Sequence, residues 1–218
     1  MIKRISIKNI KKNVLGSSEE TQHPHFIGSW NINNDSLCNN IIDLFEQNKT
    51  LQKDGITGNG LNLKVKKTKD IMITPNDLKN EKFECVNKYI SELYKCYVDY
   101  QDQWPFIKNV LSNIHIGSFN IQKYTPGGHF SKIHAERQNI QSSHRLFAWM
   151  TYLNNVDDGG TTNFSHFGIK INPEIGKTLI WPAEWTHAHN GEILNSGLKY
   201  IVTGWMHFPY TATNAYKE

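Results

Sequence analysis

From about residue 114 onward, the chain changes to short runs of β-prone residues separated by turn residues. This sequence pattern favours a closed or double-sheet β core, because either arrangement covers the apolar faces of many short strands. The predicted strands cover 114–124, 130–136, 146–153, 168–171, 178–181 and 198–208. The turns between them fall at 125–128, 157–160 and 172–174.

Two amphipathic helices are predicted ahead of this region, and they would buttress one side of the β core. Asp35 and Ser36 are the expected cap of the first helix. Its apolar face would comprise Leu37, Ile41, Leu44 and Phe45. The second helix is expected to open at 74–77 and to end near Trp104 and Pro105. Its apolar residues recur at a 3.6-residue period: Phe83, Val86, Ile90, Leu93, Tyr94, Tyr97 and Val98.

The length of 218 residues fits a single domain, and no internal repeat or low-complexity linker divides the chain. Residues 1–113 would supply an N-terminal strand and the supporting helices, and 114–210 the β core. The alternating pattern of 1–8 predicts an edge strand rather than a signal peptide, and no run is long enough to span a bilayer. The stretch 52–62 is rich in glycine and asparagine and is predicted to be a loop, either a surface connection or a lid over a substrate cleft.

Charge and cysteine content bear on partners and location. The net charge of +4 is mild, and nucleic-acid binding is not expected, because a short basic run usually forms a solvated face. That run comprises Lys64, Lys66, Lys67 and Lys69. The cysteines Cys38, Cys85 and Cys96 lack metal-finger or redox spacing, and the last two would lie about three helical turns apart, too far to form a disulfide. Buried free thiols are expected, which favours a reducing cytoplasm.

The segment His134-Ala135-Glu136 and the later His189 are candidate metal ligands. Side chains two apart in a strand point to the same side, so His134 and Glu136 can face one point. Two imidazoles and one carboxylate are the minimal ligand set of a non-heme Fe(II) oxygenase, in which other coordination positions stay open. A His-x-Glu triplet alone is weak evidence. His187 shares a strand side with His189, so the strand period leaves both open as the third ligand.

Lys199 is the second unusual feature of the β region. The run 198–208 is apolar on both faces, so the side chain of Lys199 would point into the protein. An unpaired ammonium is costly to bury, and its partner would be either a buried acid or a dianionic ligand. Charge balance favours the ligand, because Fe(II) would cancel a 2-oxo dicarboxylate and Lys199 would cancel Glu136.

Between about Ile121 and Phe208 the chain resembles the 2-oxoglutarate- and Fe(II)-dependent oxygenases, and among them the prolyl 4-hydroxylase-like branch. The resemblance rests on the order and spacing of separate segments. These are Tyr124-Thr-Pro-Gly-Gly, His134-Ala-Glu136, Arg145-Leu-Phe-Ala-Trp-Met-Thr-Tyr152-Leu-Asn154, Asp158-Gly-Gly160-Thr-Thr-Asn-Phe164, Pro173-Glu-Ile-Gly176-Lys-Thr-Leu-Ile-Trp181-Pro182, His189 and Gly197-Leu-Lys199-Tyr. In its asparagine and lysine content the chain is similar to small members encoded by marine bacteriophages.

The resemblance implies a mainly β fold with helices, in which a double-stranded β-helix (jelly-roll) core is buttressed by the N-terminal helices. His134 and Glu136 would lie near the start of one strand, and His189 on a late one. The interval of ten residues from His189 to the distal cation Lys199 selects His189 over His187 as the third ligand. His187 would then lie behind the ligands or in the substrate pocket.

The resemblance also implies roles around the co-substrate. Tyr124 would hydrogen-bond 2-oxoglutarate near the metal, and Tyr152 and Lys199 would hold its distal carboxylate. Thr203 and Trp205 would lie close to the iron and the co-substrate. The remaining histidines are expected to be structural or surface residues: His23, His25, His115, His129, His144, His166 and His207.

The implied reaction is a hydroxylation that uses Fe(II), consumes 2-oxoglutarate and O2, and yields succinate and CO2, with ascorbate as a candidate reductant. Most members carry aspartate where this chain has Glu136. Related halogenases lack that carboxylate altogether, so Glu136 favours hydroxylation. The expected substrate is a prolyl residue in a peptide or protein, and a free amino acid or small metabolite is the alternative.

Two other interpretations remain. One is a non-catalytic jelly-roll protein that binds metal or carbohydrate, and the other is a cupin-like metal enzyme that does not use 2-oxoglutarate. A carbohydrate-binding protein would not need Lys199 together with Tyr124 and Tyr152. The expected location is the cytoplasm, that of the host if the chain is phage-encoded. No membrane partner is expected, and the sequence does not predict the oligomeric state.

Overall fold

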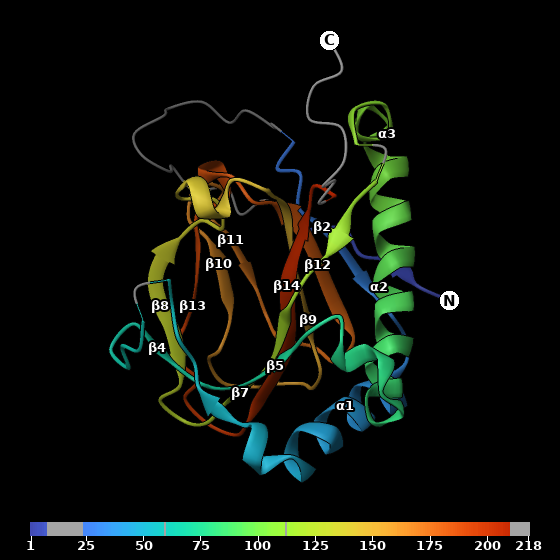
Figure 1. The fold of residues 1–218 in the computed structure, drawn as a ribbon. Coiled ribbons are helices and arrows are strands. Elements are labelled where there is room, and N and C mark those ends of the chain that lie inside the picture. The colour runs from blue at the N-terminus through green and yellow to red at the C-terminus, as the bar shows by residue number, and fades with distance from the viewer. Residues whose placement is uncertain (8–23, 59, 112, 210–218) are drawn as a thin grey trace.

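Two antiparallel β-sheets face each other, and the helices pack on the outer side of the larger sheet (Figure 1). The computed structural model describes residues 1–7, 24–58, 60–111 and 113–209. Lys8, His23 and position 59, which belong to the predictions above, lie outside these ranges. The predicted mainly β fold with buttressing helices is confirmed.

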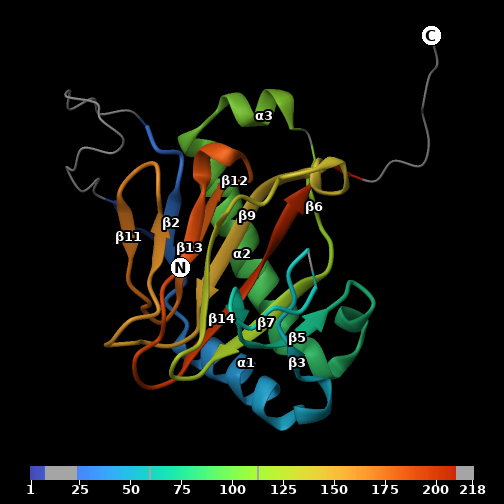
Figure 2. The same ribbon diagram turned by 90° about the vertical axis from the view of Figure 1, so that its left-hand side faces the viewer.

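The large sheet has eight strands in one hydrogen-bonded path and a ninth paired to its centre. In spatial order these are β1 (Lys3–Arg4), β2 (Gly28–Asn31), β12 (Lys177–Pro182), β9 (Arg145–Tyr152), β14 (Lys199–His207), β7 (Phe119–Tyr124), β5 (Lys69–Ile73) and β3 (Lys53–Asp54), with β6 (His115–Ile116) on β14. The small sheet has the order β11 (Ile169–Ile171), β10 (Thr162–Phe164), β13 (His189–Gly191), β8 (His129–His134) and β4 (Lys66–Lys67). Seen from the side of the small sheet, α2 (Glu84–Gln103) lies behind the large one (Figure 2).

The first helix is α1 (Asp35–Gln47), and its cap differs from the predicted one. The side chain of Asn34, rather than that of Asp35 or Ser36, accepts a hydrogen bond from the backbone N–H of Leu37 at 3.1 Å. Asn34 has the non-helical backbone that a cap requires, whereas Asp35 already belongs to the first turn. The predicted apolar face is buried, and Cys38 joins it.

Helix α2 begins ten residues later than predicted. Asp77 accepts hydrogen bonds from the backbone N–H and hydroxyl of Thr74, which closes a short turn instead of starting an α-helix. Two 3-10 helices, η2 (Asp77–Lys79) and η3 (Glu81–Phe83), connect that turn to α2. The other short helices are η1 (Lys49–Leu51), α3 (Phe106–Val110), η4 (Ile140–Ser142) and η5 (Trp185–His187).

The buried face of α2 is also shifted relative to the prediction. Tyr94 and Val98 were expected in the core but are 60% and 37% exposed. The buried residues are Val86, Tyr89, Leu93, Cys96, Tyr97 and Tyr100. All three of the buried tyrosines have hydroxyl partners: Tyr89 bonds the Thr151 hydroxyl at 2.8 Å, Tyr100 donates to a backbone carbonyl, and Tyr97 accepts from Gln101 at 3.2 Å. The predicted face included Tyr94 and Val98 in place of Tyr89, Cys96 and Tyr100, so the prediction missed two of the buried tyrosines.

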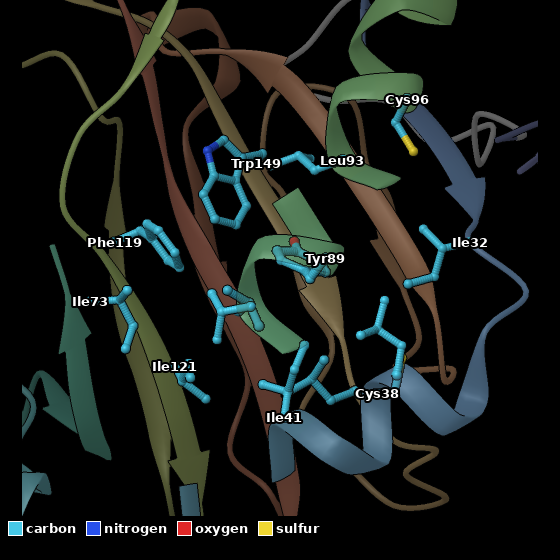
Figure 3. Packing of buried hydrophobic residues seen from close by; sticks show 14 of the residues in the cluster. Ile32, Cys38, Ile41, Ile73, Tyr89, Leu93, Cys96, Phe119, Ile121 and Trp149 are labelled. Atoms are coloured by element: carbon cyan, nitrogen blue, oxygen red, sulfur yellow. The ribbon is translucent and has the colours of Figure 1, made fainter. Parts of the chain in front are cut away.

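Two apolar cores lie on the two sides of the large sheet. The outer core joins the sheet to α1 and α2, as Trp149, Phe119 and Ile121 meet Tyr89 and Leu93 in Figure 3. The inner core lies between the sheets. Strand β14 contributes to both: Tyr200, Val202 and Met206 belong to the outer core, and Lys199, Ile201, Thr203 and Trp205 occupy the alternate positions. The predicted burial of both faces of this strand is therefore confirmed.

The first 113 residues contribute more strands than the single one predicted. Among the described residues, β1, β2, β3 and β5 extend the large sheet and β4 extends the small one. Strand β3 falls inside 52–62, so that stretch is not all loop as predicted. Strands of two to five residues are too short for a periodic signal, and only their neighbours in the sheet define them.

The cysteines are free in the described chain. Cys38 and Cys96 are buried as predicted, whereas Cys85 is partly exposed. No helix in the described ranges is long and apolar enough to cross a membrane.

Candidate metal and co-substrate site

Within the part of the chain that the structure describes, one group of side chains has the arrangement of a metal site: His134, Glu136 and His189, whose ligating atoms all lie within 4.8 Å of one another. Oε1 of Glu136 lies 3.3 Å from Nε2 of His189 and 3.7 Å from Nε2 of His134. The predicted ligands are thus brought together from β8, the turn after it and β13.

The pairing of β8 with β13 explains why the two histidines converge. His134 and His189 are direct cross-strand partners, and their ring centroids lie 4.5 Å apart. Nδ1 of each ring also contacts a backbone carbonyl oxygen. For His134 this oxygen belongs to Lys132, at 2.9 Å, and for His189 it belongs to His187, also at 2.9 Å. Nδ1 therefore carries the proton, and the Nε2 lone pair of each ring is free to bind a metal.

Glu136 is not placed as predicted. His134 is the last residue of β8, so Glu136 lies in the turn after the strand rather than near the start of a strand that both share. Its backbone carbonyl accepts a hydrogen bond from Nη1 of Arg145 at 3.0 Å, which ties the turn to the start of β9. The carboxylate reaches the histidines because the turn, not strand periodicity, directs it back toward them.

The protonation states of these groups suit a metal ion. Burial lowers the pKa of His134 to about 4, helped by the nearby His189, so the ring is neutral at pH 7. Burial opposes ionisation of Glu136, but the hydrogen bond and charge of His189 outweigh it and lower the pKa of this carboxyl. Two imidazoles and an ionised carboxylate fit Fe(II), and they leave coordination positions open for other ligands.

The structure places His189, not His187, in the cluster. Both ring nitrogens of His187 have other partners: Nε2 lies 2.8 Å from the backbone oxygen of His25, and Nδ1 lies 3.0 Å from the hydroxyl of Thr186. His187 supports the site through its backbone carbonyl, which binds Nδ1 of His189. None of the other described histidines joins the cluster.

Lys199 lies inside the same inter-sheet core and is only 2% exposed. Its Nζ donates to the backbone oxygen of Gly160 at 2.8 Å and lies 4.0 Å from the centroid of the Tyr124 ring. No carboxylate in the described chain pairs with it, so a buried acid does not account for this cation. Gly160 adopts φ +67, and a Cβ there would lie 3.2 Å from Cδ of Lys199, so glycine suits both the backbone and the close approach.

The sheet register explains how the other predicted residues gather around Lys199. Tyr124 is its direct cross-strand partner on β7, and Tyr152 on β9 faces Ile201, two residues along β14. Tyr152 is fully buried, and its hydroxyl donates to the Thr162 hydroxyl at 2.7 Å. Burial raises the pKa of both tyrosines, so their hydroxyls stay protonated and can donate.

Thr203 and Trp205 differ in their hydrogen-bond partners. The hydroxyl of Thr203 donates to the backbone oxygen of Trp149 at 2.9 Å, so it is engaged within the sheet. The indole N–H of Trp205 donates to Oε2 of Glu136 at 2.6 Å, which places Trp205 directly against the candidate metal ligands.

Arg145 and an aromatic enclosure are parts of the site that the sequence did not reveal. The guanidinium of Arg145 stacks on Trp205, 3.6 Å from the ring centroid, and its Nη1 lies 3.7 Å from Oε2 of Glu136. Phe130 stacks on His134 with centroids 4.0 Å apart, and Trp181 meets His189 edge-on at 5.1 Å. Arg145 directly precedes the predicted strand 146–153, and that position was the one available signal.

The basic run also contains a residue that the sequence misplaced. Lys66 was predicted to be solvated, but it is 4% exposed and its Nζ lies 2.6 Å from Oδ2 of Asp70. The same oxygen accepts a hydrogen bond from Gln122 at 3.1 Å, and Gln122 accepts one from the Tyr124 hydroxyl at 2.9 Å. A buried ion pair between β4 and β5 thus connects, through Gln122, to the candidate co-substrate tyrosine.

Replacing Asp70 with asparagine is expected to destabilise the protein by about 3 kcal/mol, because it leaves the buried Lys66 ammonium without its charge partner. Asp54→Asn is a matched control, since the Asp54–Lys69 pair lies on the neighbouring strands but is 46% and 51% exposed. That control should cost less than about 1 kcal/mol. Urea unfolding would measure both, and equal losses would show that the Lys66–Asp70 pair is no more important than a surface pair.

Comparison with known families agrees with this geometry. Residues 119–207, which span β7 to β14, match the model of the 2OG-Fe(II) oxygenase superfamily, where 2OG is 2-oxoglutarate. Residues 119–207 are a 2OG-Fe(II) oxygenase domain. All the predicted ligand and co-substrate residues of the oxygenase fall within this range. No curated relative matches the oxygenase by sequence.

Solved structures with the same fold include prolyl hydroxylases. A Pseudomonas putida prolyl-4-hydroxylase has a TM-score of 0.65 at 14% identity, covering 85% of the oxygenase and 94% of that chain. A prolyl hydroxylase from Trichoplax adhaerens, in complex with a hypoxia-inducible-factor peptide, scores 0.64 at 15% identity and covers 84% of each chain. A viral collagen prolyl hydroxylase from Paramecium Bursaria Chlorella virus-1 scores 0.59 at 16% identity, with 84% and 96% covered. The oxygenase therefore has the double-stranded β-helix fold of these proteins.

Proposed function

We propose that the oxygenase is a 2-oxoglutarate-dependent hydroxylase that works as a single catalytic domain and forms succinate and CO2. Its Fe(II) would be held by His134, Glu136 and His189, and its co-substrate by Lys199, Tyr124 and Tyr152. One observation carries this proposal: Lys199 is buried without a carboxylate partner in the described chain, between the same two sheets as the ligand cluster. An anion of the right length is the simplest partner for that cation.

The residues around the cluster supply orientation and a dry environment. Fe(II), when bound, would supply the redox chemistry with O2. Backbone carbonyls hold both imidazoles with Nε2 facing inward, and Phe130 and Trp181 pack against the two rings and exclude water. The Tyr124 and Tyr152 hydroxyls are protonated and lie on the same sheet as Lys199. To donate to a co-substrate oxygen, they would exchange their present acceptors, Gln122 and Thr162.

A prolyl residue in a peptide or protein is the proposed substrate. The support is the fold shared with the bacterial, viral and animal prolyl hydroxylases, one of which was solved with a peptide. The free thiols of Cys38 and Cys96 support a reducing cytoplasm as the location.

The direct test is turnover of 2-oxoglutarate to succinate by the purified protein with Fe(II), with and without ascorbate and proline-containing peptides. We expect succinate formation that requires Fe(II), rises with a suitable peptide and is sustained by ascorbate. Calorimetry with Mn(II) gives an independent reading. Tight Mn(II) binding without 2-oxoglutarate binding would instead indicate a cupin-like site, and neither binding nor turnover would favour a non-catalytic protein.

One feature favours a free amino acid as the second candidate substrate. Apart from the Lys66–Asp70 pair, Fe(II), Lys199 and Arg145 would together carry four positive charges, against three negative charges on Glu136 and 2-oxoglutarate. Arg145 then remains as a half-buried cation beside the ligands, where a substrate carboxylate could pair with it. Free amino acids belong in the same succinate assay, and stimulation by an amino acid but not by peptides would select this alternative.

A further inference from the structure

The two carboxylate oxygens of Glu136 have separate partners. Oε1 faces the histidines, 3.3 Å from Nε2 of His189 and 3.7 Å from Nε2 of His134. Oε2 faces away from them and accepts the indole N–H of Trp205 at 2.6 Å. Nη1 of Arg145 approaches the same Oε2 to 3.7 Å. The carboxylate is thus divided between the candidate metal position and the large sheet.

Glu136 needs such support because of its length and location. A glutamate has one more rotatable bond than the aspartate that most related sequences carry. It also lies past the end of β8, so no strand backbone constrains it. A longer side chain on a turn can sample several orientations, and it can offer a metal either one oxygen or both.

Trp205 is well placed to remove that freedom. It belongs to β14, at the centre of the large sheet, and is paired there with Ala148 of β9. The guanidinium of Arg145 covers its ring face at 3.6 Å from the centroid, and Nη1 of the same guanidinium holds the backbone oxygen of Glu136 at 3.0 Å. The side chains of Arg145 and Trp205, both on the large sheet, therefore fix the backbone and the carboxylate of Glu136 relative to each other.

We propose that Trp205, backed by Arg145, is the positioning residue that lets a glutamate serve as the carboxylate ligand of this site. By occupying Oε2, the indole leaves only Oε1 for the metal. A carboxylate bound through one oxygen keeps a coordination position open that a chelating carboxylate would take. This inference rests on the metal site of the proposed function and adds the element that adapts the site to a longer ligand.

A double-mutant cycle tests the coupling, with Mn(II) alone as the probe and free Mn(II) measured by electron paramagnetic resonance. In the wild-type background, Trp205→Phe should weaken Mn(II) binding by about ten- to a hundredfold, the usual effect of losing a partner that orients a ligand. In the Glu136→Asp background the same change should cost less than about threefold, because the shorter carboxylate cannot reach both the metal and the indole. Trp104→Phe, at the end of α2, is the control and should bind as wild type does.

The outcomes distinguish a failure of the positioning role of Trp205 from a failure of the metal site itself. An equal loss in both backgrounds, or no loss in either, would overturn the role of Trp205 while leaving the metal site intact. Failure of the wild-type protein to bind Mn(II) would overturn the metal site and the positioning role together. A crystal structure of the wild-type protein with Mn(II) decides the matter even if Trp205→Phe does not fold: one Glu136 oxygen on the metal and the other on Trp205 is expected, and both oxygens on the metal would refute the proposal.

Discussion

Replacing His189 with alanine is expected to lower Mn(II) affinity by more than about a hundredfold and to abolish 2-oxoglutarate turnover. The variant removes one of three ligands that lie within 4.8 Å of one another, and loss of a direct ligand should exceed the roughly 10–100-fold cost of losing an outer partner. The metal-free variant should also unfold at a lower temperature, because it removes a buried ring that packs against Phe164 and Trp181 and its Nδ1 hydrogen bond to the His187 carbonyl. Titration with Mn(II) and a succinate assay would measure the two effects.

Two neighbouring histidines provide controls for that variant. His166→Ala changes an exposed ring that contacts Trp185, and it should bind Mn(II) as the wild-type protein does. His187→Ala should retain metal binding within about tenfold, because its side chain bonds His25 and Thr186, not the cluster. If His187→Ala lost metal as completely as His189→Ala, the assignment of the third ligand would be wrong.

Replacing Lys199 with methionine is expected to weaken 2-oxoglutarate binding by roughly a hundredfold or more while leaving Mn(II) affinity within a few-fold. A buried charge partner is worth about 3–5 kcal/mol once the other charge is in place, and each 1.4 kcal/mol is a factor of ten in affinity. Methionine keeps most of the volume of the lysine, so the inter-sheet core should remain packed. Calorimetry of 2-oxoglutarate binding to the Mn(II)-loaded protein would measure this, and unchanged affinity would exclude Lys199 as the partner of the distal carboxylate.

The same lysine should make co-substrate binding depend on pH. Burial lowers the pKa of Lys199 to about 7, so the free protein loses this proton as the pH rises above 7. A dianion favours the charged form, and binding at pH 8.5 should therefore take up about one proton. The binding enthalpy should then differ between phosphate and Tris buffers at pH 8.5, converge at pH 6, and show no buffer dependence of this origin in Lys199→Met.

The free energy of unfolding of the free protein should depend on pH in the opposite sense to co-substrate binding. Unfolded Lys199 keeps its proton up to about pH 10.4, whereas the folded residue loses it near pH 7. The unfolded state therefore binds more protons between these values, and the contribution of this residue to the free energy of unfolding rises with pH across that window. Bound co-substrate should remove the effect, because it keeps Lys199 charged in the folded state.

The ligand set and the buried lysine could be predicted because they depend on short-range patterns. His134, Glu136, His189 and Lys199 were found from spacing in strands and from a family resemblance, and the structure brings the first three into one cluster. The position of Glu136 was predicted from strand periodicity, yet the residue lies beyond the strand end. The sequence pattern identified the residue types correctly, but it could not show which backbone geometry joins them.

Features that depend on distant partners could not be predicted. Lys66 looks like part of a solvated basic run, and only the packing of β4 and β5 over Gln122 buries it beside Asp70. Arg145 likewise acquires its place because Trp205, sixty residues later, lies under its guanidinium. Neither contact leaves a periodic or local signal in the chain.

The division of the site between two sheets has a consequence for the length of the co-substrate. The proposed metal ligands belong to the small sheet and the turn after β8, whereas Lys199, Tyr124 and Tyr152 belong to the large sheet, which α1 and α2 brace from outside. A dicarboxylate that bridges them must match the separation between the sheets. An acid one methylene shorter, such as oxaloacetate, would leave either the metal or the ammonium without its partner, so the spacing of the sheets itself would select a five-carbon co-substrate.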